Sequence, residues 1–179
     1  DNLVTLDPKN STYYDSNWKE LRSRLEALDK GIKASVATVP PENRVLLTYH
    51  DSFPMFGLQY GVKILGAVQP SNFTEPSARE VARLITQIKE THVPAIFGSE
   101  VFPSPVMAQI AKESGAKFVD QLRDDDLPGM PGDLSHSYVG LILSDMEIMI
   151  PALGGNTSAL ADLDAGLVFK EPSTAVYPQ

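Results

Sequence analysis

A stripe of apolar residues marks the first element that the chain predicts. Between residues 18 and 39, apolar side chains recur every three or four positions, which places them on one face of a helix. The stripe consists of Trp18, Leu21, Leu25, Leu28, Ile32, Val36 and Val39. Pro40 and Pro41 follow it, and proline cannot continue a helix. The pattern predicts one helix of about 25 residues, long enough to brace more than one folded body.

Apolar runs of a different kind follow this helix and alternate with further helical patterns. Four short runs rich in β-branched and aliphatic residues predict buried strands, at residues 44–50, 61–68, 94–100 and 116–122. Such an alternation predicts right-handed crossovers between the strands. The predicted fold class is therefore α/β, with a four-stranded, mostly parallel sheet flanked by helices and preceded by the long helix.

The predicted helices lie between these strands and after the last one. A short helix is expected over residues 51–60, and Ser77 with Glu80 forms a capping box at the start of the next. Another is expected between Ser104 and Gly115. The last carries apolar residues from Val139 to Leu153. Residues 156–179 are expected to be a loosely attached tail with a short strand at 166–169.

Composition narrows the classes of function. The 179 residues suffice for one well-cored domain, and 42% hydrophobic with 21% charged residues is typical of a folded soluble protein. A net charge of −8 argues against nucleic acid as a partner, because its binders rely on Lys and Arg. The chain has no cysteine, which excludes thiolate metal sites, disulfides and cysteine catalysis. No apolar stretch approaches the roughly 20 residues of a membrane span.

Ionisable residues gather where the predicted strands end. Ligands of open parallel sheets bind outside the carboxyl ends of the strands, so side chains at these ends are candidates for a site. One imidazole and several carboxylates are expected there, namely His50, Asp51, Glu100, Asp124, Asp125 and Asp126. Imidazole nitrogen and carboxylate oxygen together suit a divalent cation such as Zn²⁺ or Mn²⁺. The sequence thus predicts a metal site at this edge.

Each of these residues taken alone also fits an ordinary role. A histidine at a strand end is often capped or solvated, three consecutive aspartates often form a solvated loop, and Glu100 also suits a bond to a helix N-terminus. His92 is expected on the surface of a helix-to-strand turn at the opposite edge. His136, at the start of the last helix, suits capping or packing. The chain contains no GxGxxG, GxxxxGK[ST], HExxH or GxSxG motif.

Three longer stretches together resemble one known family. They are RVLLTYHDSFPMFGLQYGVKILG, NFTEPSAREVARLITQIKETHVPAIFGSEVFPSPVMAQIAKESGAKFV and LRDDDLPGMPGDLSHSYVGLILSDMEIMIPALGG. The set, which spans residues 7 to 155, resembles the zinc- and manganese-binding solute-binding proteins of ABC transporters, including their adhesin-like lipoproteins. In that family one long rigid helix joins two α/β lobes, and the metal is held between them.

The resemblance implies a division of the chain. Residues 1–10 would be the end of an N-terminal lobe that is missing from this chain, and residues 11–41 the connector helix. Residues 42–155 would be the C-terminal lobe, and residues 156–179 the tail.

The resemblance also implies ligands. His50 matches the family pattern HD[AS]F, in which zinc-type members have His and manganese-type members often have Glu. Asp125 is fourth in the Leu-x-x-Asp pattern that carries the last ligand, with Asp124 and Asp126 as register alternatives. Glu100 matches an acidic position near the site that is not ordinarily a ligand, and Asp51 is a further acidic neighbour.

One position departs from the family. Its members commonly read DPHxWLDP before the connector helix, and the histidine is a ligand. This chain reads DNLVTLDP, with Leu3 in place of the histidine and Thr5 in place of the tryptophan. Leucine cannot coordinate a metal, so either another group replaces this ligand or the metal affinity is altered or lost.

The implied function is capture of a divalent metal outside the cytoplasmic membrane of a bacterium, for delivery to an ABC permease. The resemblance implies a non-enzymatic protein, periplasmic or anchored to the extracellular face of the membrane, and His50 favours Zn²⁺ over Mn²⁺. The missing lobe or self-association would cover part of the connector helix. One alternative is a metal-degenerate, adhesin-like interaction module. Another is a small metal-dependent hydrolase that uses His50 with Asp51 or Asp125 as base.

Overall fold

A single parallel sheet organises the part of the chain that the computed structural model describes, residues 2–69, 76–99, 104–123 and 125–168. Its four strands follow the order β2-β1-β3-β4, and all three neighbouring pairs are parallel. The strands are β1 (Val45–His50), β2 (Lys63–Gln69), β3 (Ala95–Ser99) and β4 (Lys117–Leu122). The predicted α/β class and four strands are therefore confirmed.

The five predicted helices also lie where the patterns placed them. They are α2 (Ser11–Thr38), α3 (Pro54–Tyr60), α4 (Ala78–Thr91), α5 (Pro105–Ser114) and α6 (Tyr138–Ala152). A short helix that was not predicted, α1 (Asn2–Leu6), precedes them, and the described residues also form the short 3-10 turns η1 (Pro8–Asn10), η2 (Pro41–Asn43) and η3 (Ser158–Leu160). The capping box of α4 is present: Ser77 N donates to the Glu80 carboxylate at 2.8 Å, and Ser77 Oγ accepts from Glu80 N.

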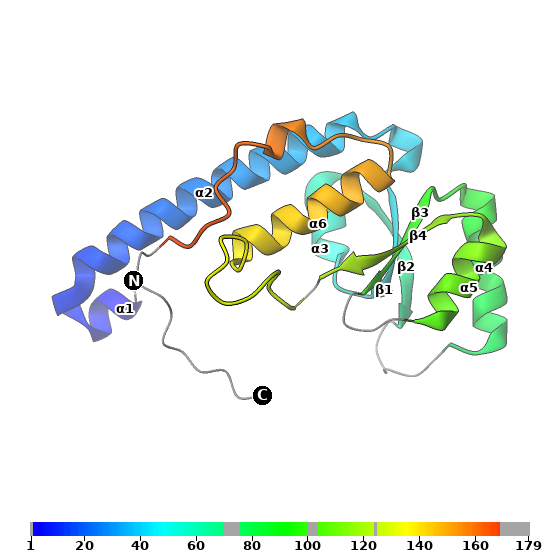
Figure 1. Cartoon of the computed structure of the whole chain (residues 1–179), viewed down its shortest axis with the longest axis horizontal. Coiled ribbons are helices and arrows are strands. Elements are labelled where there is room, and N and C mark those ends of the chain that lie inside the picture. Colours follow the sequence, from blue (N-terminus) through cyan, green and yellow to red (C-terminus); the bar gives the residue numbers. More distant parts are fainter. Residues whose placement is uncertain (1, 70–75, 100–103, 124, 169–179) are drawn as a thin grey trace.

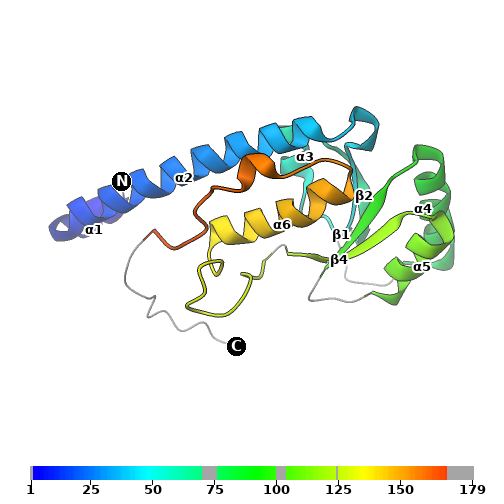
Figure 2. The ribbon, with the colours of Figure 1, turned by 45° about the horizontal axis from the view of Figure 1, so that its top comes forward.

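Helices cover both faces of the sheet and give it two cores. Helices α4 and α5 lie on one face, and α2 and α6 on the other (Figure 1; Figure 2). Successive side chains of a strand point to opposite faces. On β1, Leu47 and Tyr49 accordingly join the core under α4 and α5, whereas Leu46 joins the core under α2 and α6. Burial on both faces explains why the strands read as continuous apolar runs.

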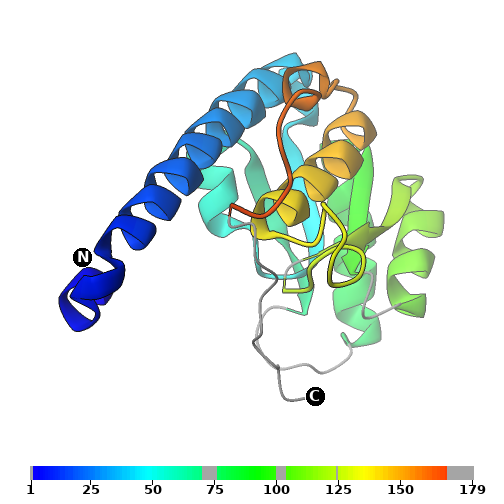
Figure 3. The ribbon, with the colours of Figure 1, turned by 60° about the vertical axis from the view of Figure 1, so that its left-hand side comes forward.

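Helix α2 extends well beyond the sheet. Its 28 residues make it about 42 Å long. The C-terminal half packs on α6, whereas the N-terminal half projects away from the sheet (Figure 3). Trp18, within the apolar stripe, keeps 57% of its surface exposed, and Tyr13 keeps 53%. An apolar cavity of about 500 Å³ opens here, lined by Leu3, Tyr13, Tyr14, Asn17, Trp18, Leu21, Ser137, Tyr138, Val139, Gly166, Leu167 and Val168.

Residues 156–168 form a strap along α2, so the expectation of a loosely attached tail is wrong for this part. Arg24 on α2 pairs with Asp164 at 3.0 Å and donates to the carbonyl of Gly166 at 2.6 Å. Leu160 is buried against Gly31, where a Cβ would lie 2.6 Å from the leucine Cδ2. The expected strand at 166–169 is also wrong for residues 166–168, which follow an irregular path. Residue 169 lies outside the described residues.

A polar clamp holds α3 on the long helix. The carboxylate of Asp29 accepts hydrogen bonds from Lys33 (2.7 Å), Gln59 (3.1 Å) and the hydroxyl of Tyr60 (3.1 Å). Burial of the phenol, with a further contribution from its bond to Asp29, raises the pKa of Tyr60 from 10.0 to about 12. The same three bonds lower the pKa of Asp29. The clamp is therefore built from a neutral phenol and an ionised carboxylate.

The clamp predicts an alkaline transition. Because the pKa of Tyr60 is raised in the folded state, its protonated form stabilises the fold below pH 10, and this stabilisation is lost as the pH rises from 10 to about 12. Phenolate absorbance should show a component that titrates near pH 12 and disappears in Tyr60→Phe. Tyr13→Phe is the control, because this exposed tyrosine lies outside the clamp. Persistence of the component in Tyr60→Phe would contradict the assignment.

Candidate metal centre

His50 is the last residue of β1, at the carboxyl edge of the sheet. Alternation along the strand places it on the same face as Leu46 and Thr48, the face that α6 covers. The hydroxyl of Thr48 donates to the backbone carbonyl of His50 at 2.6 Å. The imidazole lies edge-on to the ring of Tyr49, with centroids 4.7 Å apart. The strand end is thus held by local contacts and the imidazole is half-buried.

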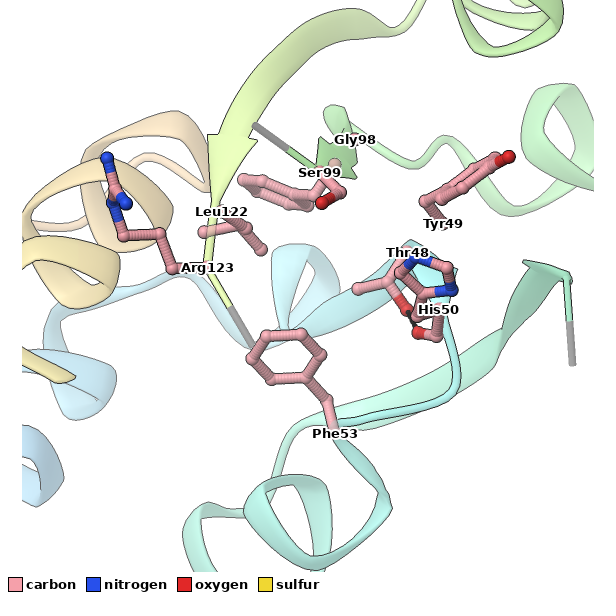
Figure 4. Close-up of a pocket in the computed structure, with 9 residues that line it drawn as sticks. Thr48, Tyr49, His50, Phe53, Gly98, Ser99, Leu122 and Arg123 are labelled. Carbon is pink, nitrogen blue, oxygen red and sulfur yellow. Dashed lines mark hydrogen bonds between the residues drawn. The ribbon is translucent and has the colours of Figure 1, made fainter. Parts of the chain in front are cut away.

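A small hollow lies beside the imidazole (Figure 4). Its volume is about 10 Å³, which corresponds to a single water molecule. The ends of β1, β3 and β4 all contribute to its lining, which consists of Thr48, Tyr49, His50, Phe53, Phe97, Gly98, Ser99, Leu122 and Arg123. The prediction that these strand ends share one edge is therefore confirmed. A hollow of this size suits one water or one ion and is too small for an organic ligand.

A bulge in β4 sets which side chains reach this hollow. Phe97 of β3 pairs with Val119 of β4, and Ser99 pairs with Leu122. Two residues of β3 are therefore matched by three residues of β4. The extra residue in β4 turns Leu122 toward the hollow, where an unbroken register would have placed Gln121. After the bulge, the inward and outward side chains of β4 exchange places compared with an unbroken strand.

Three of the predicted carboxylates, Asp51, Asp125 and Asp126, lie in segments that follow β1 and β4. Asp51 directly follows β1, and Asp125 and Asp126 follow β4 after a short gap; all three are exposed. Glu100 and Asp124 lie outside the described residues. Within the described ranges, no three histidine or carboxylate side chains lie close enough together to hold a metal ion. The structure thus brings His50 into the hollow and leaves Asp125 on the adjoining loop.

Leu3 lies elsewhere. It belongs to α1 and lines the 500 Å³ apolar cavity beside Trp18, and it is not among the residues that line the hollow of His50. With 59% of its surface exposed, it is an apolar residue at the uncovered end of the long helix. The residue that replaces the expected histidine is therefore unsuited to a metal in both chemistry and position.

The two other histidines have structural roles. His92 is the exposed C-cap of α4 in a left-handed conformation (φ 51°), just before β3 and thus at the opposite edge from His50. The Nδ1 atom of His136 lies 3.2 Å from the carbonyl oxygen of Pro128, so its ring packs within the loop before α6. Both sequence expectations, a surface turn and a packing role, are confirmed.

Sequence reasoning missed Asp145, on α6. Its side chain is only 2% exposed, and Oδ1 accepts a hydrogen bond from the backbone N–H of Arg123 at 3.0 Å. A buried carboxylate is uncommon and requires such donors. The available signal was an acidic residue next to the apolar positions of the last helix, between Leu143 and Met146. Arg123 lines the hollow, so this bond connects α6 to the wall of the candidate site.

Comparison with known proteins decides the family. The model of the family described as "Zinc-uptake complex component A periplasmic" matches residues 1–150. The chain belongs to this family. It is 30% identical over 151 residues to the manganese-binding lipoprotein MntA of Bacillus subtilis (strain 168), a match that covers 82% of this chain and 49% of MntA. The chain spans about half the length of the curated relatives it matches.

Solved structures agree with this assignment. The periplasmic zinc-binding protein TroA from Treponema pallidum superposes with a TM-score of 0.76 at 25% identity, over 85% of this chain and 56% of TroA. The laminin-binding protein Lbp of Streptococcus pyogenes superposes with a TM-score of 0.74 at 25% identity, over 85% and 57%. These relatives are named as binding proteins, and none of the three as an enzyme. No helix in the described ranges is long and apolar enough to cross a bilayer.

Proposed function

We propose that this chain is the C-terminal lobe and connector helix of a solute-binding protein that captures a divalent metal and delivers it to an ABC permease. Membership of the zinc-uptake family carries the proposal, together with a histidine beside an ion-sized hollow at the carboxyl edge of the sheet. Delivery to a permease requires a location outside the cytoplasmic membrane of a bacterium, in the periplasm or anchored to the membrane, as the names of the relatives suggest.

We infer that zinc is favoured over manganese. Relatives named for each metal match the chain, so the choice depends on the ligands. A neutral imidazole at position 50 suits Zn²⁺, whereas a carboxylate would suit Mn²⁺ better. His50 and Asp125 supply two protein ligands, and a closed zinc shell requires four. Water or groups from a second lobe would complete the shell, because Leu3 supplies nothing.

Calorimetry tests the metal site. Zn²⁺ should bind this chain weakly, because two protein ligands give little chelate advantage, and more tightly than Mn²⁺. His50→Ala and Asp125→Ala should each weaken Zn²⁺ binding at least tenfold, since each removes one of the two ligands. His92→Ala is the matched control, as it removes a histidine at the other edge of the sheet. Zn²⁺ affinity that survives both ligand substitutions would place the site elsewhere.

The uncovered N-terminal half of α2 offers an apolar surface to which another folded unit could bind. Tyr13 and Trp18 of α2, with Tyr138 at the start of α6, line the apolar cavity and are all more than half exposed. Exposed apolar patches of this kind usually mark an interface. Because the chain spans about half the length of its relatives, we propose that a second α/β lobe covers this surface. In the isolated chain, a second copy would take its place.

Light scattering tests this interface. The isolated chain should self-associate at high concentration, because association removes the apolar surface around Trp18 from water. Trp18→Ser should shift the equilibrium toward the monomer. Met55→Ser is the control, because Met55 is 75% exposed on α3 and does not line the cavity. If the wild-type chain remained strictly monomeric at high concentration, the proposed self-association would be refuted.

Two alternatives remain distinguishable by experiment. The structural similarity to a laminin-binding protein favours, as second candidate, an adhesin-like module that has lost its metal. Metal stoichiometry of the protein purified with both lobes would separate the two, since the adhesin-like module would carry none. The hydrolase alternative is disfavoured by the names of the relatives and by the small size of the hollow. Turnover of ester or phosphate substrates with added Zn²⁺ would revive it.

A further inference from the structure

A carboxylate buried behind the candidate site connects helix α6 to the end of β4. Asp145 is 2% exposed, and its neighbours along α6 belong to the core under α2 and α6. Its Oδ1 accepts from the backbone N–H of Arg123, the first residue after β4. Burying a carboxylate in such surroundings is costly unless the group is hydrogen-bonded. The bond from Asp145 therefore holds the backbone of Arg123 in place.

Arg123 is the point where this bond acts on the site. The residue forms part of the wall of the hollow beside His50. Its guanidinium points away from the imidazole (Figure 4), and Nη1 lies 3.5 Å from the carbonyl oxygen of Leu127. This contact spans the segment that contains Asp125. Holding the Arg123 backbone therefore fixes part of the wall of the hollow, two residues before Asp125.

The other end of the same loop is also tied to α6. Ser137 caps this helix by accepting from Gly140 N at 2.9 Å, and its hydroxyl donates to the carbonyl of Ala165 in the strap. Within the loop, Met130 N donates to the carboxylate of Asp133 at 2.8 Å. The loop is thus anchored to α6 at its end through Ser137. Asp145 provides the corresponding anchor at its start.

We propose that Asp145 is a positioning residue for the metal site: by holding the N–H of Arg123, it fixes the loop that presents Asp125 at the edge occupied by His50. The anchor lies directly after the bulge in β4, where the sheet pairing has shifted by one residue at Leu122. Groups hydrogen-bonded directly to a ligand typically change metal affinity by about 10- to 100-fold, which is the upper range for an anchor two residues away from the ligand. The inference rests on the proposed metal binding.

Substitutions at position 145 separate positioning from stability. Asp145→Leu fills a similar volume but accepts no hydrogen bond, so Zn²⁺ affinity should fall about 10- to 100-fold. Asp145→Asn keeps an acceptor oxygen and should bind Zn²⁺ within about threefold of wild type, a rescue that loss of packing alone cannot explain. Met107→Ala, on α5 in the other core, removes a fully buried side chain and should leave the affinity unchanged. Asp145→Ala replaces the leucine variant if that variant does not fold.

Amide hydrogen exchange gives a readout that needs no metal. Exchange of the Arg123 N–H should become faster in Asp145→Leu and stay slow in Asp145→Asn and Met107→Ala. The positioning role would be overturned if Asp145→Leu bound Zn²⁺ as tightly as the wild-type chain, or if Met107→Ala lost as much affinity as Asp145→Leu. Failure of the proposed metal site would give a different result. In that case Asp125→Ala would bind Zn²⁺ as tightly as the wild-type chain does.

Discussion

The apolar seam between α6, the C-terminal half of α2 and one face of the sheet is the constraint on which the other features depend. Leu46, Phe97 and Met149 are fully buried in it, and each such side chain contributes about 1.5–3 kcal/mol when removed from water. The seam fixes α6 above the ends of the strands. Because α6 is fixed, the loop that leads from β4 into it must cross the carboxyl edge of the sheet.

That geometry limits what the carboxyl edge of the sheet can offer to the proposed metal. The parallel strands bring His50, Ser99 and Leu122 to one edge, and the hollow there holds no more than a water or an ion. Asp125 lies exposed on the loop that follows β4. An edge formed by strand ends and one loop leaves room for groups from outside this chain, as the proposed function requires.

The long helix carries both buried and uncovered apolar surface. Its buried half belongs to the seam, while its uncovered half, around Trp18, offers apolar surface to a further body. The strap at residues 156–168 reinforces the middle of the helix through Arg24 and Leu160. A helix anchored firmly at one end and exposed at the other can transmit the position of one lobe to another, as the two-lobed architecture of the proposed function requires.

The sequence by itself determined the fold class, the order of the elements and His50 at the edge of the sheet. Period-3.6 and buried-strand patterns are local consequences of burial, so α2 and β1 could be located from the chain alone. Tertiary structure decided the rest. The bulge that redirects Leu122, the burial of Asp145 against Arg123 and the docking of Leu160 on Gly31 each depend on residues distant in the chain. Simple alternation along a strand cannot reveal a bulge, and a helical pattern cannot reveal which backbone N–H lies opposite a buried carboxylate, because both depend on how separate elements pack.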